Sequence, residues 1–130
     1  MEDFCTAFQQ TVSANLVRHR SILDAITKFQ ESGARVNRAV AKAATACGCI
    51  EIGVLKQPMP ESMLLSDFKD SASSHICGEL CEHCREIIEE ELGNNLFYLT
   101  AMCELLGLNL HDIVQKENNR VSTLGYFKLG

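Results

Sequence analysis

Tryptophan is absent from this chain, and aromatic residues make up only 6% of its 130 residues. Single-stranded nucleic acid is usually held by stacking on several aromatic side chains, so this composition disfavours such a function. Positive charge is also scarce, because 17 acidic residues outnumber 12 Lys and Arg residues and leave a net charge of −5. A broad positive surface that attracts nucleic acid is therefore not expected. We expect no nucleic-acid partner.

Long hydrophobic runs are missing as well. No stretch of about 18 consecutive apolar residues occurs, so we expect no membrane span. The opening residues Met1-Glu2-Asp3-Phe4 are acidic, and no apolar segment typical of a signal peptide follows them. We therefore expect a cytoplasmic protein. Its length and its hydrophobic content of 46% predict one globular domain over residues 1–130.

Proline occurs only twice, and apolar residues recur at helical spacing along most of the chain. The first stripe is Phe4, Phe8, Val12 and Leu16. The second has the alternating four- and three-residue steps of a coiled-coil seam: Ile22, Ile26, Phe29, Gly33, Val36, Val40, Ala43 and Cys47. The third is Ile88, Leu92, Leu96, Leu99, Cys103 and Leu106. The stripes predict an all-α fold, a bundle of about four helices with a break at residues 18–21.

Helix boundaries are predicted from capping residues. Ser21, with Asp24 three residues later, forms a potential capping pair at the start of the second helix. Gly48 and Gly107 suit left-handed positions that end the second and third helices. Asn109 is expected to cap the fourth helix.

Residues 50–76 form the least helical stretch. Ile50–Val54 is predicted to be a short extended piece, Glu61–Phe68 to hold a helical turn or two, and Asp70–Ser74 to be a polar loop. The third helix is expected to run from about Leu80 to Leu106, and the fourth to end near Asn118.

Seven cysteines stand out in a chain expected to stay in a reducing compartment, where disulfides are rare. Two close pairs stand at the ends of predicted helices, and such pairs supply the soft tetrahedral ligands that zinc prefers. We predict one structural Zn²⁺ that staples the loop between the second and third helices. Its predicted ligands are Cys47, Cys49, Cys81 and Cys84. A member of this set could be replaced by His75, Cys77 or His83.

Other interpretations of the cysteines stay open. A Cys-x-x-Cys pair can be redox-active, although the βαβ pattern that usually accompanies this role is absent. The same thiolates could release zinc on oxidation and act as a sensor. Cys84 beside His83 could act as a nucleophile, and iron could replace zinc in a four-sulfur site. Cys5 and Cys103 fit apolar stripes and are expected to be packing residues.

The segment Glu90–Leu99, with the sequence Glu-Glu-Leu-Gly-Asn-Asn-Leu-Phe-Tyr-Leu, leads through Leu106-Gly107-Leu108 to Asn109–Arg120. Over about forty residues it resembles the second half of MazG-type all-α nucleotide pyrophosphohydrolases. The resemblance implies a MazG-like helical domain that assembles through its helices, here as a homodimer. It also implies Mg²⁺ held between a Glu-x-x-Glu motif on one helix and a Glu-x-x-Asp motif on the next, with a nucleotide as substrate.

This chain departs from the family at the catalytic motifs. Glu91 matches the Glu of the second motif, but Asn94 stands where the Asp belongs. No Asp or Glu occurs between Glu31 and Glu51, where the first motif is needed. Mg²⁺ requires several hard oxygen ligands, so we assign no catalytic residue and favour a non-catalytic interaction or regulatory module.

The alternative is a divergent nucleoside triphosphate pyrophosphohydrolase. Its Mg²⁺ ligands would be Glu90, Glu91 and Asn94, its phosphate-binding residues Lys116, Asn119 or Arg120, and further carboxylates Asp67 or Asp70. The combination of Cys-Gly-Cys-Ile, a later Cys-x-x-Cys and Glu-Leu-Gly-x-Asn-Leu-Phe-Tyr-Leu also resembles a small bacterial family, a resemblance that implies no activity.

Overall fold

The structure, a computed structural model, describes residues 3–17, 20–53 and 74–124. Within these ranges the elements are α1 (Phe4–Asn15), α2 (Ile22–Lys42), the π-helical turn η1 (Ala43–Cys47), β1 (Ile50–Ile52), β2 (Ile76–Gly78), α4 (Glu82–Leu106) and α5 (Leu110–Leu124). The predicted all-α class is confirmed, with one small antiparallel sheet that joins β1 to β2. No helix in the described part of the chain is both long and apolar enough to cross a membrane.

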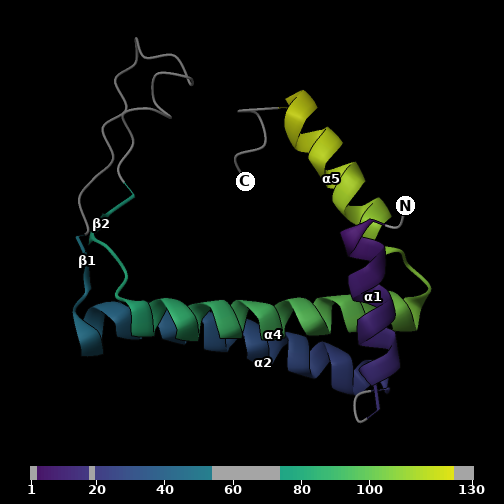
Figure 1. The fold of residues 1–130 in the computed structure, drawn as a ribbon, viewed down its shortest axis with the longest axis horizontal. Coiled ribbons are helices and arrows are strands. Elements are labelled where there is room, and N and C mark those ends of the chain that lie inside the picture. The colour runs from purple at the N-terminus through teal and green to yellow at the C-terminus, as the bar shows by residue number, and fades with distance from the viewer. Residues whose placement is uncertain (1–2, 18–19, 54–73, 125–130) are drawn as a thin grey trace.

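The long helices α2 and α4 lie side by side and run in opposite directions (Figure 1). The residues of α2 and η1 that become buried are small: Ala25, Ser32 and Ala43. Seven residues, about two helical turns, separate Ala25 from Ser32, so they lie on one face. Small side chains on this face allow the two helices to approach closely.

Asn95 of α4 fixes the polar centre of this contact. Its Nδ2 donates hydrogen bonds to the Phe29 carbonyl oxygen at 3.3 Å and to the Ser32 Oγ at 3.0 Å. A Cβ added to Gly33 would lie 3.8 Å from the same nitrogen, so the backbone of α2 passes near the Asn95 side chain. The predicted apolar seam is therefore partly wrong, because an amide takes a central position between the helices.

The larger apolar residues of that seam are left on one flank of the α2/α4 pair. Ile22 and Ile26 of α2 are 37% and 47% exposed, and Leu92 and Leu96 of α4 are 51% and 44% exposed. We call these four residues the apolar flank. At about 100° per residue they project to one side of the buried stripe.

The opposite flank of the pair is polar. Arg35, Arg38 and Lys42 of α2 line one hollow together with Ile87 and Glu91 of α4. Because residues of both helices line this hollow, the polar faces of α2 and α4 lie on the same side of the pair. The apolar flank therefore occupies the other side of the pair.

Helix α1 crosses the C-terminal end of α4 (Figure 1). Val12 of α1 and its C-cap residue Leu16 pack against Ala101 of α4 in a second core cluster, flanked by Phe8, Phe97 and Leu105. The side chain of Gln9 links α1 to α4 and α5. Its Nε2 donates to Glu104 Oε2 at 3.2 Å and to the Leu108 carbonyl oxygen at 2.9 Å, and its Oε1 accepts from the Leu110 amide at 2.8 Å. The predicted break before α2 is confirmed, since α1 ends at Asn15 and α2 begins at Ile22.

Most of the predicted helix ends are confirmed. Gly48 and Gly107 are left-handed, with φ of 80° and 71°. The Asn109 Oδ1 accepts a hydrogen bond from the Asp112 amide at 3.1 Å. Ser21 is the N-cap of α2 by position, and Asp24 lies in the first turn of the helix, but the Ser21 side chain makes no capping hydrogen bond, so the part of the predicted capping pair that Ser21 was to make is wrong.

The fourth helix is longer than predicted. Helix α5 continues through Asn118 and Asn119 to Leu124, because Val121 and Leu124 extend its apolar pattern and no Gly or Pro interrupts it. It contacts α1 and projects away from the α2/α4 pair (Figure 1). The helical turns predicted for Glu61–Phe68 lie outside the described residues.

Candidate metal centre

The first cysteine pair leaves the end of α2 through a change of helix type. After Lys42 the helix widens into the π-helical turn η1, which was not predicted, and Cys47 is its last residue. The Gly48 amide donates to the Ala43 carbonyl oxygen at 2.8 Å, and the left-handed Gly48 then reverses the chain. π-Helical turns are frequent at functional sites. This turn lets Cys47 and Cys49 reach the same point from a spacing of only one residue.

The β1–β2 hairpin brings the chain back to the same end of the molecule. Ile50 is paired with Gly78, so the residue after Cys49 lies opposite a position close before Cys81. Cys81 is the N-cap of α4, and its Sγ accepts a hydrogen bond from the Cys84 amide at 3.4 Å. The extended segment predicted from Ile50 is confirmed as β1, whereas its partner strand from Ile76 was not foreseen.

The structure brings four thiols together at this point. The Sγ atoms of Cys47, Cys49, Cys81 and Cys84 all lie within 4.8 Å of one another. Cys47 Sγ and Cys81 Sγ are 3.8 Å apart, too far for a disulfide of about 2.05 Å. A tetrahedron with metal–sulfur bonds of about 2.3 Å has sulfur–sulfur edges of about 3.8 Å. The four cysteines could therefore bind a metal ion with little rearrangement.

The thiols of this cluster are electrostatically unequal. The backbone amide of Cys84, followed by the Cys84 side chain, lowers the pKa of Cys81 to about 7. The Cys81 side chain, followed by burial, raises the pKa of Cys84 to about 12. Negative charge thus gathers first on the sulfur at the N-terminus of α4, where the helix dipole also favours it. A bound cation would relieve the repulsion that keeps the second thiol protonated.

A small apolar core lies beneath the cluster. Ala43, Ile50, Cys84 and Ile88 are buried together, and Leu80 packs against them. Cys84 is only 8% exposed, whereas Cys47 is exposed and Cys49 and Cys81 are half-buried. The cluster thus joins the end of η1, the β-hairpin and the start of α4 above this small core.

The remaining cysteines and the two nearby histidines lie outside this group of four. Cys103 is 4% exposed and Cys5 is half-buried, as expected for packing residues. Cys77 is exposed on β2. His83 lines a hollow of 200 Å³ beside Cys47 and Cys84. His75 has a left-handed φ of 62° next to β2. That His75, Cys77 or His83 replaces one of the four cysteine ligands stays a prediction.

The residues of the hydrolase alternative are not brought together. In the described part of the chain the four-thiol cluster is the one group of His, Cys, Asp and Glu side chains that could hold a metal ion. Glu91 and Asn94 line different hollows. Lys116, Asn119 and Arg120 line a separate hollow of 540 Å³ on α5. Asp67 and Asp70 lie outside the described residues.

The three comparisons with known proteins give no relative. The chain matches no protein-family description, no curated protein and no solved structure. The resemblance to MazG-type proteins therefore remains a prediction, and the class that the structure itself defines is a helical protein with a four-cysteine cluster that could bind metal.

Gly78 offers a test of how the hairpin shapes the cluster. Its φ is 88°, and an added Cβ would lie 2.7 Å from the Cys49 carbonyl oxygen. Gly78→Ala is expected to push β2 away from Cys49 and weaken zinc binding by about tenfold or more, because metal affinity depends on ligand placement. Competition with a zinc chelator measures this. Gly53→Ala is the matched control, since a Cβ there meets nothing within 4 Å; equal affinities of the two variants would contradict the account.

Proposed function

We propose that this chain is a zinc-stapled helical module that acts by binding to a second copy of itself and to regulatory partners, not by catalysis. The proposal rests above all on the four thiols within 4.8 Å of one another. Four protein ligands fill a tetrahedral zinc ion and leave no position for a substrate, which is the arrangement of a structural site. Such an ion would hold α2, the β-hairpin and α4 in one fixed geometry.

The apolar flank supports self-association. Four large aliphatic side chains remain between 37% and 51% exposed on the two longest helices, and they lie on one side of the pair. Helices normally bury such stripes, and a second copy of the α2/α4 pair would complete a four-helix bundle around them. The interpretation as a MazG-like domain agrees with this proposal, because that resemblance also implies assembly through helices.

The hydrolase alternative has weaker support. Opposite Glu91, helix α2 presents Arg35, Arg38 and Lys42, where a magnesium site would need carboxylates. Without such ligands, metal-assisted attack on a phosphate has no place to occur at this contact.

An activity assay distinguishes the two functions. The zinc-loaded protein is expected to release no pyrophosphate from any common nucleoside triphosphate with Mg²⁺ or Mn²⁺, since the carboxylates that would hold these ions are missing. Pyrophosphate release that scales with protein concentration and disappears in Glu91→Ala would contradict the proposal and establish the hydrolase. Glu86→Ala, on the same helix but outside the hollow that Glu91 lines, is the matched control.

A further inference from the structure

We propose that the polar flank of the α2/α4 pair binds the phosphate group of a small phosphorylated molecule directly, without a bridging metal ion. The site consists of Arg35, Arg38 and Lys42, which we call the basic groove. This inference goes beyond the zinc-stapled function, because it concerns another ligand, and the three cationic residues lie outside the four-thiol cluster. The apolar hollow that continues from the basic groove is lined partly by Cys47 and Cys84 and so borders that cluster.

Charge in the basic groove opposes the sign of the whole protein. The chain carries a net charge of −5, yet three cationic side chains here face one carboxylate, Glu91. They lie at positions i, i+3 and i+7 of α2 and so share one helix face. Among the described residues, Arg38, Lys42 and Glu91 make no ion pair or side-chain hydrogen bond. These charges are therefore available to a ligand.

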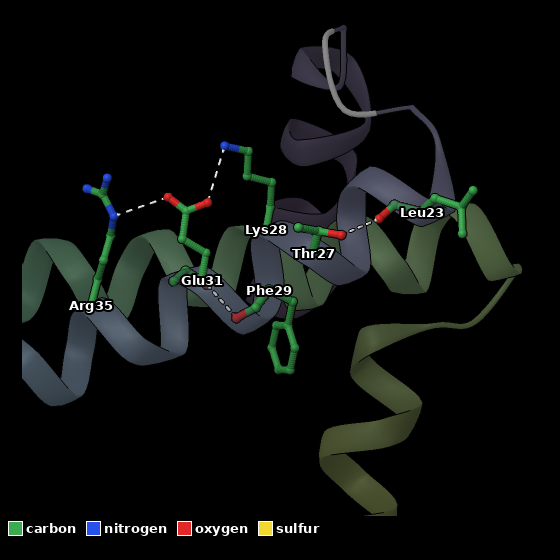
Figure 2. A network of polar contacts seen from close by, with 7 residues as sticks. Leu23, Thr27, Lys28, Phe29, Glu31 and Arg35 are labelled. Atoms are coloured by element: carbon green, nitrogen blue, oxygen red, sulfur yellow. Dashed lines mark hydrogen bonds and ion pairs between the residues drawn. The ribbon is translucent and has the colours of Figure 1, made fainter.

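Glu31 positions the Arg35 side chain through its Nε atom alone. Its Nε lies 3.5 Å from Glu31 Oε1, while the other oxygen of Glu31 lies 3.4 Å from Lys28 Nζ. In Figure 2 the Arg35 side chain stands out from α2 with its Nε toward Glu31, and its two terminal nitrogens point away from Glu31. A guanidinium held in this way can still offer paired N–H donors to an anion, the geometry that suits phosphate.

The basic groove lies in a hollow that is open to solvent and large enough for a small molecule. The hollow is also lined by Glu91, Ala39 and Ile87, and its volume of about 340 Å³ is in the range of ordinary ligand pockets. A second hollow of about 200 Å³ shares Ala39, Lys42 and Ile87 with it and continues toward His83. That second hollow is mostly apolar, because Ala43 and Ala46 of η1 line it together with Cys47 and Cys84. A ligand with a phosphate at one end and an apolar or aromatic body at the other fits the two hollows together.

Direct binding follows from the balance of charge. A phosphate bridged by metal would need several carboxylates around the ion, and Glu91 alone supplies one. Three cations provide enough positive charge for a dianionic phosphate ester, and the Glu91 carboxylate then repels the bound phosphate. Removing the Glu91 charge should therefore strengthen a directly bound phosphate but weaken a metal-bridged one.

The test is calorimetric titration of the zinc-loaded protein with phenyl phosphate and with inorganic phosphate, in buffer without Mg²⁺. We expect saturable binding of both, about tenfold tighter for phenyl phosphate because its ring buries apolar surface. Arg38→Ala and Lys42→Ala should each weaken binding about tenfold, since each removes a charge-assisted contact. Glu91→Gln should strengthen it.

Arg85→Ala is the matched control, because it removes one exposed positive charge from α4 outside the groove. It should leave both affinities within about twofold. Three results would overturn the inference: no binding by wild-type protein, equal losses in Arg38→Ala and Arg85→Ala, or binding that requires Mg²⁺ and disappears in Glu91→Gln. Zinc content, measured in every variant, separates failure of this site from failure of the zinc-stapled fold.

Discussion

Replacing Cys81 with serine is expected to abolish zinc binding and to lower the thermal midpoint of unfolding by about 10 °C or more. Cys81 carries the thiol with the lowered pKa at the N-cap of α4. Serine suits an N-cap position but lacks the thiolate that zinc prefers, so the substitution removes a ligand and keeps the helix cap. The core beneath the site consists of four buried residues, of which two are alanine and cysteine. Without the ion, burial of so small a core does not compensate for the conformational entropy lost when the hairpin is ordered. Zinc analysis and thermal melts of the same samples measure both effects.

The matched control is Cys77→Ser. Cys77 lies on β2 within four residues of Cys81, but it is exposed and outside the four-thiol cluster. This variant should keep the wild-type zinc content and midpoint. The account is contradicted if Cys81→Ser retains its zinc, or if Cys77→Ser loses as much zinc as Cys81→Ser.

The second large effect concerns self-association. The double variant Leu92→Glu/Leu96→Glu is expected to convert a dimer of the 14.4 kDa chain into a monomer. The substitutions would place two unpaired carboxylates from each chain in an apolar interface, and each buried unpaired charge costs about 3–5 kcal/mol. The shift in dissociation constant should therefore exceed about a hundredfold. Light scattering over a range of concentrations gives the molar mass.

Val114→Glu provides the comparison for this variant. The exposed fraction of Val114, 47%, is similar to those of Leu92 and Leu96. Val114 lies on α5, however, and is not part of the apolar flank. Its molar mass should stay that of the wild type. A wild-type protein that is monomeric at high concentration would contradict self-association, as would a double variant whose mass does not change.

The sequence predicted the helices well because their signals are local. Apolar spacing and the two helix-ending glycines, Gly48 and Gly107, were enough to place α1, α2 and α4 and the ends of the long pair. The end of α5 was misplaced, because asparagine at positions 118 and 119 only weakens a helix and the packing of neighbouring turns decides the outcome.

Side-chain partners across helices were harder to predict. A heptad pattern indicates which residues are apolar, but not which flank meets the neighbouring helix of the same chain. The pair came to pack through Ala25, Ser32 and Asn95, so Ile26 and Leu92 were left half-exposed. Nothing local signals that an asparagine will reach the carbonyl of Phe29 on another helix.

The four-cysteine cluster was indicated by spacing alone, since pairs one and two residues apart at helix ends are typical of zinc ligands. The sequence did not indicate how the fold brings these four cysteines together. The π-helical turn at Ala43–Cys47 and the pairing of Ile50 with Gly78 depend on contacts between segments distant in sequence. Such contacts leave no periodic pattern.

Zinc X-ray absorption spectroscopy on protein purified without added metal tests the central claim most directly. The account predicts one zinc ion per chain, surrounded by four sulfur atoms at about 2.3 Å. A folded protein without metal would contradict it, and the cluster would then be a set of core or redox thiols. A shell containing nitrogen would contradict the assignment of Cys47, Cys49, Cys81 and Cys84 as the complete ligand set and would indicate His75 or His83.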